Sequence, residues 1–153
     1  MVFQFRLIFS CASFKIDPMG WEGPIKNRGG KTVMQKRILV VDDDDMNLMR
    51  TKRILGFDYD VFFASSGIEA LDTLKREEMD LVLLDIEMPK MNGFETFERM
   101  KEFAADIPVI FLTASGQEDD VVSAIRLGAV NYLKKPFPPQ ELLMRVTQEL
   151  EKR

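Results

Sequence analysis

Acidic side chains collect at two places where apolar runs end. Four aspartates, Asp42 to Asp45, follow the run ILVV, and Asp85 closes the run LVLLD. If these runs are neighbouring parallel strands, Asp42, Asp43 and Asp85 share one crevice at the carboxyl edge of the sheet. Carboxylates in such a crevice either hold protons through raised pKa values or bind a cation. Oxygen ligands without histidine or cysteine favour a hard ion, and a shallow site that keeps several waters favours Mg²⁺ over Ca²⁺.

Each acidic position also has a plainer interpretation. Asp44 and Asp45 are suited to cap the first helix, because aspartate is favoured at helix N-termini. Asp42 and Asp43 directly follow a buried strand, so we assign them to the site. Asp85 could simply start a turn. The segment after it, IEMPKMNG, already contains a proline and a glycine, so the turn itself does not require a carboxylate there.

A hydroxyl and an ammonium group stand at the ends of two further apolar runs. Thr113 closes VIFLT, and Lys135 follows NYLK. Taken singly, Thr113 is an ordinary β-branched strand residue and Lys135 an ordinary surface lysine. A carboxylate nucleophile that attacks phosphorus needs a cation, a hydroxyl donor and a compact ammonium group. Mg²⁺, Thr113 and Lys135 would fill these three roles.

Short apolar runs alternate with amphipathic stretches from Lys36 onward, which predicts an α/β fold. ILVV and LVLL lack polar alternation, as is typical of central strands buried on both faces. Apolar residues three and four apart, such as Leu71 and Leu74, indicate helices between the strands. We expect a doubly wound, parallel, flavodoxin-like sheet of order 2-1-3-4-5. The predicted strands are Arg37 to Asp42, Tyr59 to Ala64, Asp80 to Asp85, Pro108 to Thr113 and Val130 to Leu133.

Composition narrows the class of protein. The chain has 153 residues, of which 46% are hydrophobic, enough for one substantial core. Its formal net charge of -4 argues against a general nucleic-acid surface. Histidine is absent, which excludes Ser-His-Asp and Cys-His catalysis and histidine metal ligands within the chain. Any histidine chemistry has to come from a partner.

The first 33 residues differ from the rest. They hold five basic and two acidic side chains, so that the net charge from Met34 onward is -7. Val2 to Phe14 is apolar but too short to span a bilayer, and no basic segment precedes it as in a secretory signal. Asp17 to Lys31 is dense in glycine and proline, which predicts a linker or flexible arm without regular structure. We therefore expect an extension over 1–33 and a domain over 34–153, with Met34 as the hypothetical natural start.

Four motifs resemble those of the response-regulator receiver domains of two-component signalling, over about residues 36–150. They are ILVVDD, LVLLD followed by IEMPKMNG, VIFLTAS and NYLKKPF, in the family's order and spacing. The resemblance implies that Asp85 accepts the phosphoryl group, that Asp43 and Asp85 bind Mg²⁺ directly and that Asp42 binds it through water. Glu87 would add its backbone carbonyl, and Mn²⁺ could substitute for Mg²⁺.

The same resemblance implies a switch. Thr113 is similar to the family's switch hydroxyl, Lys135 to its phosphate-binding lysine and Tyr132 to the aromatic residue that changes rotamer on activation. The bond between Lys135 and Pro136 is expected to be cis. Phosphorylation would then alter the surface formed by the fourth helix, the fifth strand and the fifth helix.

Two features depart from the family's usual pattern. The stretch from Asp43 to the second strand is about one residue shorter than usual, with Gly56 ending the first helix early. This affects the face of the first helix, a common docking surface for the kinase in the family. Family members also vary at the positions of Glu87 and Ser115, which influence how quickly the phosphoryl group is lost.

The resemblance also bears on partners. It implies a sensor histidine kinase or a histidine phosphotransfer protein, an unknown downstream protein target and a homodimer formed on phosphorylation. The charge balance and the short apolar stretch at the start of the chain argue against direct contact with nucleic acid or membrane. The single cysteine, Cys11, suits a reducing, cytoplasmic compartment. The last predicted helix ends near Leu150, so we expect no output domain after it. The chain would then be a stand-alone receiver, a phosphorelay intermediate or a fragment of a larger regulator or hybrid kinase, and not a turnover enzyme.

Two other classes fit the sequence less well. An aspartate-nucleophile phosphatase normally carries Asp-x-Asp and then Gly-Thr after its first strand, where this chain has DDDDMN. A flavin-binding protein of this fold needs a phosphate loop rich in serine, threonine or glycine at that place, where four aspartates would repel an anionic cofactor. The sequence therefore favours the receiver.

Overall fold

The computed structural model describes residues 14–16, 22–24, 34–114, 118–128 and 131–152. The chain divides into two compact units, Met1–Lys36 and Arg37–Arg153. In the first unit, β1 (Phe14–Ile16) and β2 (Glu22–Pro24) form an antiparallel pair. The boundary between the units therefore lies three residues beyond the predicted one.

The prediction that Asp17 to Lys31 lacks regular structure was wrong at β2. Proline is excluded from central strands because it donates no hydrogen bond, but an edge strand has one side without a partner strand. In a pair of two strands both members are edges, and Pro24 closes β2 opposite Phe14. The flexibility predicted for 1–33 otherwise concerns positions outside the described residues.

The second unit is built on a parallel sheet. Its order is β4-β3-β5-β6-β7, which is the predicted order 2-1-3-4-5. Its strands are β3 (Arg37–Val41), β4 (Asp60–Ala64), β5 (Leu81–Asp85), β6 (Val109–Thr113) and β7 (Asn131–Lys134). The five predicted strands are confirmed to within one residue at their described ends. Val130, the predicted start of the last strand, lies outside the described residues.

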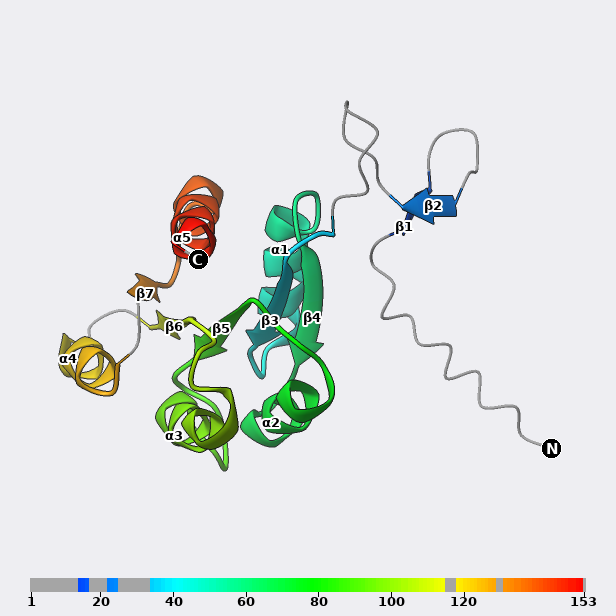
Figure 1. The fold of residues 1–153 in the computed structure, drawn as a ribbon. Coiled ribbons are helices and arrows are strands. Elements are labelled where there is room, and N and C mark those ends of the chain that lie inside the picture. Colours follow the sequence, from blue (N-terminus) through cyan, green and yellow to red (C-terminus); the bar gives the residue numbers. More distant parts are fainter. Residues whose placement is uncertain (1–13, 17–21, 25–33, 115–117, 129–130, 153) are drawn as a thin grey trace. The chain divides into compact units, whose positions relative to one another are not determined.

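Helices cover both faces of this sheet. They are α1 (Asp45–Leu55), α2 (Gly67–Arg76), α3 (Gly93–Ala104), α4 (Glu118–Arg126) and α5 (Pro139–Glu151). α1 and α5 lie on one face and α2 and α3 on the other, while α4 contacts β7 (Figure 1). No helix in the described part of the chain is long and apolar enough to cross a membrane.

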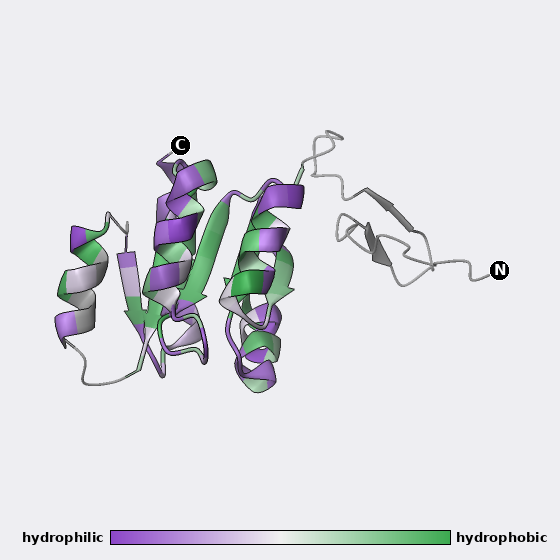
Figure 2. Cartoon of the chain, turned by 90° about the horizontal axis from the view of Figure 1, so that it is seen from below, coloured by the Kyte–Doolittle hydropathy of each residue, from purple (hydrophilic) through white to green (hydrophobic). Residues whose placement is uncertain are grey.

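The two faces of the sheet form two parts of the core. Successive side chains of a strand point to opposite faces. Val82 and Leu84 therefore pack with α2 and α3, whereas Leu81 and Leu83 pack with α1 and α5. Figure 2 shows the strands as mostly hydrophobic and the helices as mixed, as expected when each helix turns one apolar face to the sheet. Since β5 is buried over its whole length, the carboxylate of Asp85 is brought to the end of a fully buried strand.

The first helix ends where the sequence predicts. α1 stops at Leu55, its C-cap is Gly56, and the N–H of Gly56 donates to the carbonyl of Lys52 at 2.8 Å. Gly56 has a φ of -67°, in the right-handed region. The helix end therefore does not use the left-handed conformation for which glycine is usually selected.

Candidate functional site

Three carboxylates meet at the carboxyl edge of the sheet. β3 and β5 are parallel neighbours in which Val41 lies opposite Leu84, so the residues that follow, Asp42 and Asp85, lie side by side. Asp42, Asp43 and Asp85 each offer an oxygen atom within 4.8 Å of the others. Asp42 and Asp85 are only 1% and 4% exposed, whereas Asp43 is exposed. The donor set consists of oxygens alone and fits a hard divalent cation, reached from the solvent through Asp43.

Lys135 closes this acid cluster from the other side. Its Nζ donates to Oδ2 of Asp42 at 2.7 Å and lies 3.2 Å from Oδ1 of Asp85. The backbone N–H of Lys135 donates to the carbonyl of Thr113 at 2.7 Å, which ties the chain after β7 to the end of β6. The Lys135–Pro136 bond is cis, as predicted. One ammonium group is thus shared by two buried carboxylates.

Burial and these charges change the acidity of two groups. Burial raises the pKa of Asp85 to about 6, against the opposing effect of the Lys135 ammonium, and the negative charges of Asp42 and Asp43 add to the rise. Burial alone would lower the pKa of Lys135, but its hydrogen bond to Asp42 and its attraction to both carboxylates outweigh burial and raise it. Asp85 is therefore still ionised at neutral pH, beside a firmly protonated lysine.

Thr113 lies at the same edge without touching the acids. Leu112 pairs with Asp85, so Thr113, the last residue of β6, projects one step beyond it. Its side chain is buried, and its hydroxyl donates to the carbonyl of Ala114 at 3.1 Å. The hydroxyl thus has a local partner only one residue away.

The loop after β5 folds back on the end of its strand. The N–H of Gly93 donates to the carbonyl of Ile86 at 2.9 Å. A Cβ on Gly93 would overlap the carbonyl oxygen of Asp85, so only glycine permits this close approach. Within the loop, Lys90 has a φ of 68°, in the left-handed region. This turn starts α3 immediately behind Asp85, while Glu87 stays exposed.

Asp44 and Asp45 have the plainer roles that the sequence predicts. Oδ1 of Asp44 accepts a hydrogen bond from the N–H of Met46 at 2.8 Å, which caps α1, and Asp45 opens the first turn. The N–H of Asp44 also donates to Oδ1 of Asp42 at 3.0 Å. The cap therefore helps to hold the orientation of a carboxylate in the cluster.

Comparison with known proteins decides the family. The model of the response regulator receiver domain matches residues 38–147. The chain belongs to the response-regulator receiver family. Solved receivers have the same fold: a CheY-like receiver domain protein from Methanospirillum hungatei JF-1 has a TM-score of 0.74 and 34% identity over 78% of this chain and 96% of its own. A receiver domain protein from Clostridium thermocellum has a TM-score of 0.72 and 32% identity over 76% and 95% of the two chains.

Curated relatives of this receiver are longer proteins. The response regulator SaeR of Staphylococcus aureus is 40% identical over 114 residues, which are 74% of this chain and 50% of SaeR. The probable transcriptional regulator ycf27 of Porphyridium aerugineum is 38% identical over 121 residues, which are 78% of this chain and 50% of that protein. The receiver chain thus spans about half the length of these curated relatives.

Not every predicted site residue of the receiver joins the acid cluster. The structure brings together Asp42, Asp43, Asp85 and Lys135. Tyr132 is 36% exposed in the edge strand β7 and does not contribute to the cluster. The roles predicted for Tyr132 and for the backbone carbonyl of Glu87 stay predictions.

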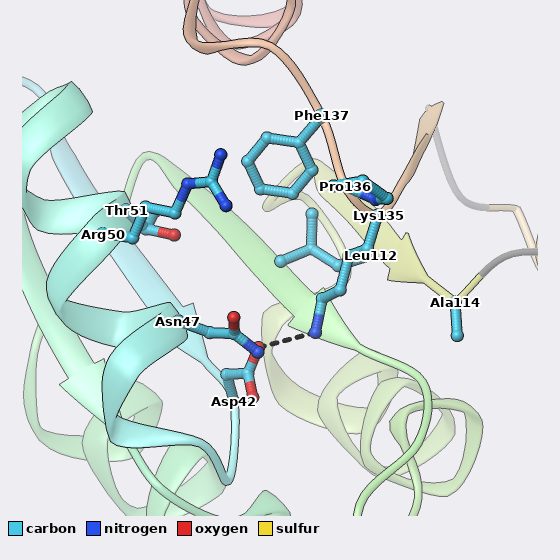
Figure 3. A pocket seen from close by; sticks show the side chains of 9 residues that line it. All are labelled: Asp42, Asn47, Arg50, Thr51, Leu112, Ala114, Lys135, Pro136 and Phe137. Atoms are coloured by element: carbon cyan, nitrogen blue, oxygen red, sulfur yellow. Dashed lines mark hydrogen bonds and ion pairs between the residues drawn. The ribbon is translucent and has the colours of Figure 1, made fainter.

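Three residues of α1 that lie beside the cluster were not predicted from the sequence. Asn47, Arg50 and Thr51 line a pocket that also contains Asp42 and Lys135 (Figure 3). Their spacing of three and four residues places Asn47, Arg50 and Thr51 on one helix face, which is a signal present in the sequence. That spacing does not reveal which segment this face of α1 lies against, because the opposite wall of the pocket comes from the chain after β7.

Proposed function

We propose that this receiver accepts a phosphoryl group on Asp85 from a histidine kinase or a histidine phosphotransfer protein, with Mg²⁺, and signals through the surface of α4, β7 and α5. The observation that supports it most is the convergence of Asp42, Asp85 and Lys135 at the carboxyl edge of the sheet. A nucleophile, a cation site and a phosphate-binding ammonium group are the parts that phosphoryl transfer to a carboxylate requires. Since the chain has no histidine, the donor is a partner.

Asp85 supplies the nucleophile. An oxygen lone pair of its carboxylate forms the new O–P bond in line with the N–P bond of phosphohistidine. The electron pair of the N–P bond leaves with the imidazole of the partner. The pKa of about 6 keeps Asp85 ionised at pH 7. Burial also removes water that would otherwise screen the carboxylate from its neighbours.

Lys135 and a Mg²⁺ ion held by the aspartates would offset the negative charge of the phosphoryl group. Asp42, Asp43 and Asp85 would hold Mg²⁺, which offsets negative charge on phosphoryl oxygens when it is bound. Lys135 Nζ, 3.2 Å from Oδ1 of Asp85, is near enough to hold an oxygen of the acyl phosphate. Its hydrogen bond to Asp42 fixes the ammonium group in this position beforehand.

Thr113 and Tyr132 would convert phosphorylation into a surface change. The Thr113 hydroxyl would exchange its local bond to the carbonyl of Ala114 for one to a phosphoryl oxygen. Tyr132 would turn from its exposed position into the space that Thr113 leaves. The affected surface carries exposed apolar residues of three elements: Val122, Ile125, Tyr132 and Met144. An apolar surface of this kind suits a protein partner or a second copy of the chain.

The experiment is phosphorylation by a small donor. Wild type, Asp85→Asn and Asp45→Asn would be incubated with acetyl phosphate, with EDTA, Mg²⁺ or Mn²⁺, and resolved by phosphate-affinity gel and intact mass. Asp45 is a matched control because it is an exposed aspartate on α1 outside the cluster. We expect a metal-dependent adduct on wild type and Asp45→Asn, and none on Asp85→Asn.

Two results would contradict the proposal. An adduct of equal yield on Asp85→Asn would place the acceptor elsewhere. Absence of any adduct with either metal, on protein whose amide spectrum shows that it is folded, would favour a receiver that acts as an unphosphorylated binding module.

A further inference from the structure

A pocket of about 240 Å³ borders the acid cluster on the side of α1. Its walls come from α1, from the end of β6 and from the chain between β7 and α5, and the Lys135–Asp42 ion pair crosses its base (Figure 3). Asp43 and Asp85 are not among its lining residues, which are Asp42, Asn47, Arg50, Thr51, Leu112, Ala114, Lys135, Pro136 and Phe137. The pocket and the acid cluster therefore share the ion pair but face different sides of it.

The charge of this pocket is opposite to that of the domain. Arg50 and Lys135 line it together with a single carboxylate, Asp42, whereas the net charge from Met34 onward is -7. Because Lys135 is already paired with Asp42, the excess positive charge of the lining comes from Arg50, and it favours an anion.

The exposed side chain of Arg50 has a guanidinium group without a partner among the described residues. Arg37 and Arg145 use theirs in ion pairs with Glu77 and Glu141. Arg50 makes no hydrogen bond or ion pair with any residue in the described ranges. Figure 3 shows its side chain reaching from α1 toward Phe137 across the pocket. An unpaired guanidinium group at a pocket is suited to a carboxylate or a phosphate.

The remaining walls are apolar. Leu112, Pro136 and Phe137 contribute side chains without charge, and Phe137 presents an aromatic ring. A cavity of roughly 150 Å³ holds one benzene ring, so 240 Å³ admits one ring with a small charged group. Apolar walls with a few convergent polar groups are the usual make-up of a small-molecule site.

We propose that this pocket binds a small organic anion that carries one apolar ring, with its anionic group between Arg50 and Lys135 and its ring against Leu112 and Phe137. Because Lys135 also holds Asp42 and Asp85, such an anion competes for the ammonium group of the acid cluster. Its binding therefore slows phosphorylation, a consequence that rests on the proposed function, whereas the binding itself does not.

Binding is measured first, in the presence of EDTA, by amide chemical shifts during titration with phenyl phosphate. Benzyl alcohol tests the ring without the charge, and inorganic phosphate tests the charge without the ring. Arg50→Gln is compared with Arg53→Gln, an exposed arginine of α1 that does not line the pocket. We expect saturable shifts at Asn47, Arg50 and Phe137, and binding about tenfold weaker in Arg50→Gln only, because hydrogen bonds to charged groups are the strong ones.

Equal weakening of phenyl phosphate binding in Arg50→Gln and Arg53→Gln would overturn the site. So would binding of benzyl alcohol or of inorganic phosphate as tight as that of phenyl phosphate. Chemical shift changes confined to Asp43 and Asp85 would also overturn it. Phe137→Leu serves as a second variant and should weaken phenyl phosphate while leaving inorganic phosphate unchanged. Asp85→Asn should still bind phenyl phosphate, so a failure of the phosphorylation proposal is distinguishable from a failure of this one.

The link to phosphorylation is measured separately. Phenyl phosphate should slow adduct formation from acetyl phosphate and Mg²⁺ in wild type and Arg53→Gln, and should have little effect on Arg50→Gln. An equal slowing of all three proteins would show that phenyl phosphate acts outside this pocket and would overturn the coupling through Lys135.

Discussion

Charged groups cluster at both ends of the parallel strands, and the two clusters are built differently. At the amino edge, Arg37 lies opposite Asp60 in the register of β3 and β4. Its guanidinium group donates to Glu77 at 2.7 Å and lies 4.6 Å from the ring centroid of Phe62, and its backbone N–H donates to Asp80 at 2.8 Å. This amino-edge cluster contains one arginine fixed by several contacts. At the carboxyl edge, one lysine is shared by Asp42 and Asp85.

Each cluster contains a buried aspartate with a raised pKa. Burial raises the pKa of Asp60 despite the nearby Arg37, and Glu77 adds to the rise. Burial raises that of Asp85 in the same way. The shift alone therefore does not identify a reactive site. What differs is convergence: within the described residues, only Asp42, Asp43 and Asp85 bring carboxylate oxygens close enough together to hold a cation.

The largest expected effect is on the carboxyl edge. Lys135→Met removes the ammonium group that neutralises the phosphoryl group, so the rate of adduct formation from acetyl phosphate should fall by at least about a hundredfold. Lys134→Met, at the exposed neighbouring position, is the control and should react like wild type. Rates are measured by phosphate-affinity gel. A fall of similar size in both variants would contradict the role given to Lys135.

The corresponding change at the amino edge should affect stability instead of reactivity. Arg37→Met leaves Glu77 and the buried Asp60 without their cation, so the free energy of unfolding should fall by about 1–3 kcal/mol. Urea denaturation measures this, with Arg99→Met, an exposed arginine of α3, as the control. Adduct formation by the folded Arg37→Met should remain at the wild-type rate. A loss of reactivity there would mean that the two edges are coupled.

The pH dependence of stability compares the two buried aspartates in metal-free buffer. Folded Asp85, with a pKa of about 6, keeps a proton that the unfolded chain, with the ordinary value of 3.8, has lost. The free energy of unfolding therefore decreases as the pH rises from about 4 to 6, by about 1–2 kcal/mol after solvent screening. Asp85→Asn lacks this loss, so its stability relative to wild type should increase over this range of pH. Because burial also raises the pKa of Asp60, the stability of Asp60→Asn relative to wild type should likewise increase as the pH rises above 3.8.

Thr73→Ala is the control for this measurement, because it changes no titratable group, and it should show no such gain. Urea denaturation at several pH values gives the comparison. If the stability of Asp85→Asn relative to wild type fell instead of rising as the pH increases, the direction of the pKa shift would be wrong.

The smallest effect on chemistry is expected at Thr113. Thr113→Ala should still form the adduct, because its hydroxyl touches none of the carboxylates. The amide shift changes that phosphorylation causes in α4, β7 and α5 should be reduced to less than half. Thr73→Ala is the control, since its hydroxyl also donates to a backbone carbonyl, that of Glu69. Undiminished shift changes in Thr113→Ala would refute the switch role.

The sheet could be predicted because two features of the sequence identify each central strand, its apolar run and the polar residue at its end. Continuous apolar runs such as Leu81 to Leu84 signal strands buried on both faces, and polar residues such as Asp85 and Thr113 mark where these strands end. The pair of β1 and β2 could not be predicted, because Gly23 and Pro24 oppose a strand by local preference. Only pairing with a second strand overrides that preference, and the pairing is not visible in the local pattern.

The acid cluster could be predicted for the same reason as the sheet. Asp85 closes its strand, Asp42 and Lys135 directly follow theirs, and the strand order brings these strand ends together. Arg50 could not be predicted to border this site, because an exposed arginine on a helix looks like any solvated charge. Its position depends on how α1 packs beside the chain that follows β7, and these segments are distant in the sequence.

The most direct test of the central claim asks which carboxylate carries the phosphoryl group. After reaction with acetyl phosphate and Mg²⁺, borohydride reduces an aspartyl phosphate to homoserine, and tandem mass spectrometry reads which aspartate was converted. Conversion at Asp85 alone, absent when Mg²⁺ is withheld, is the predicted result. Conversion at Asp42 or Asp43, or at Asp60 of the amino edge, would contradict the account.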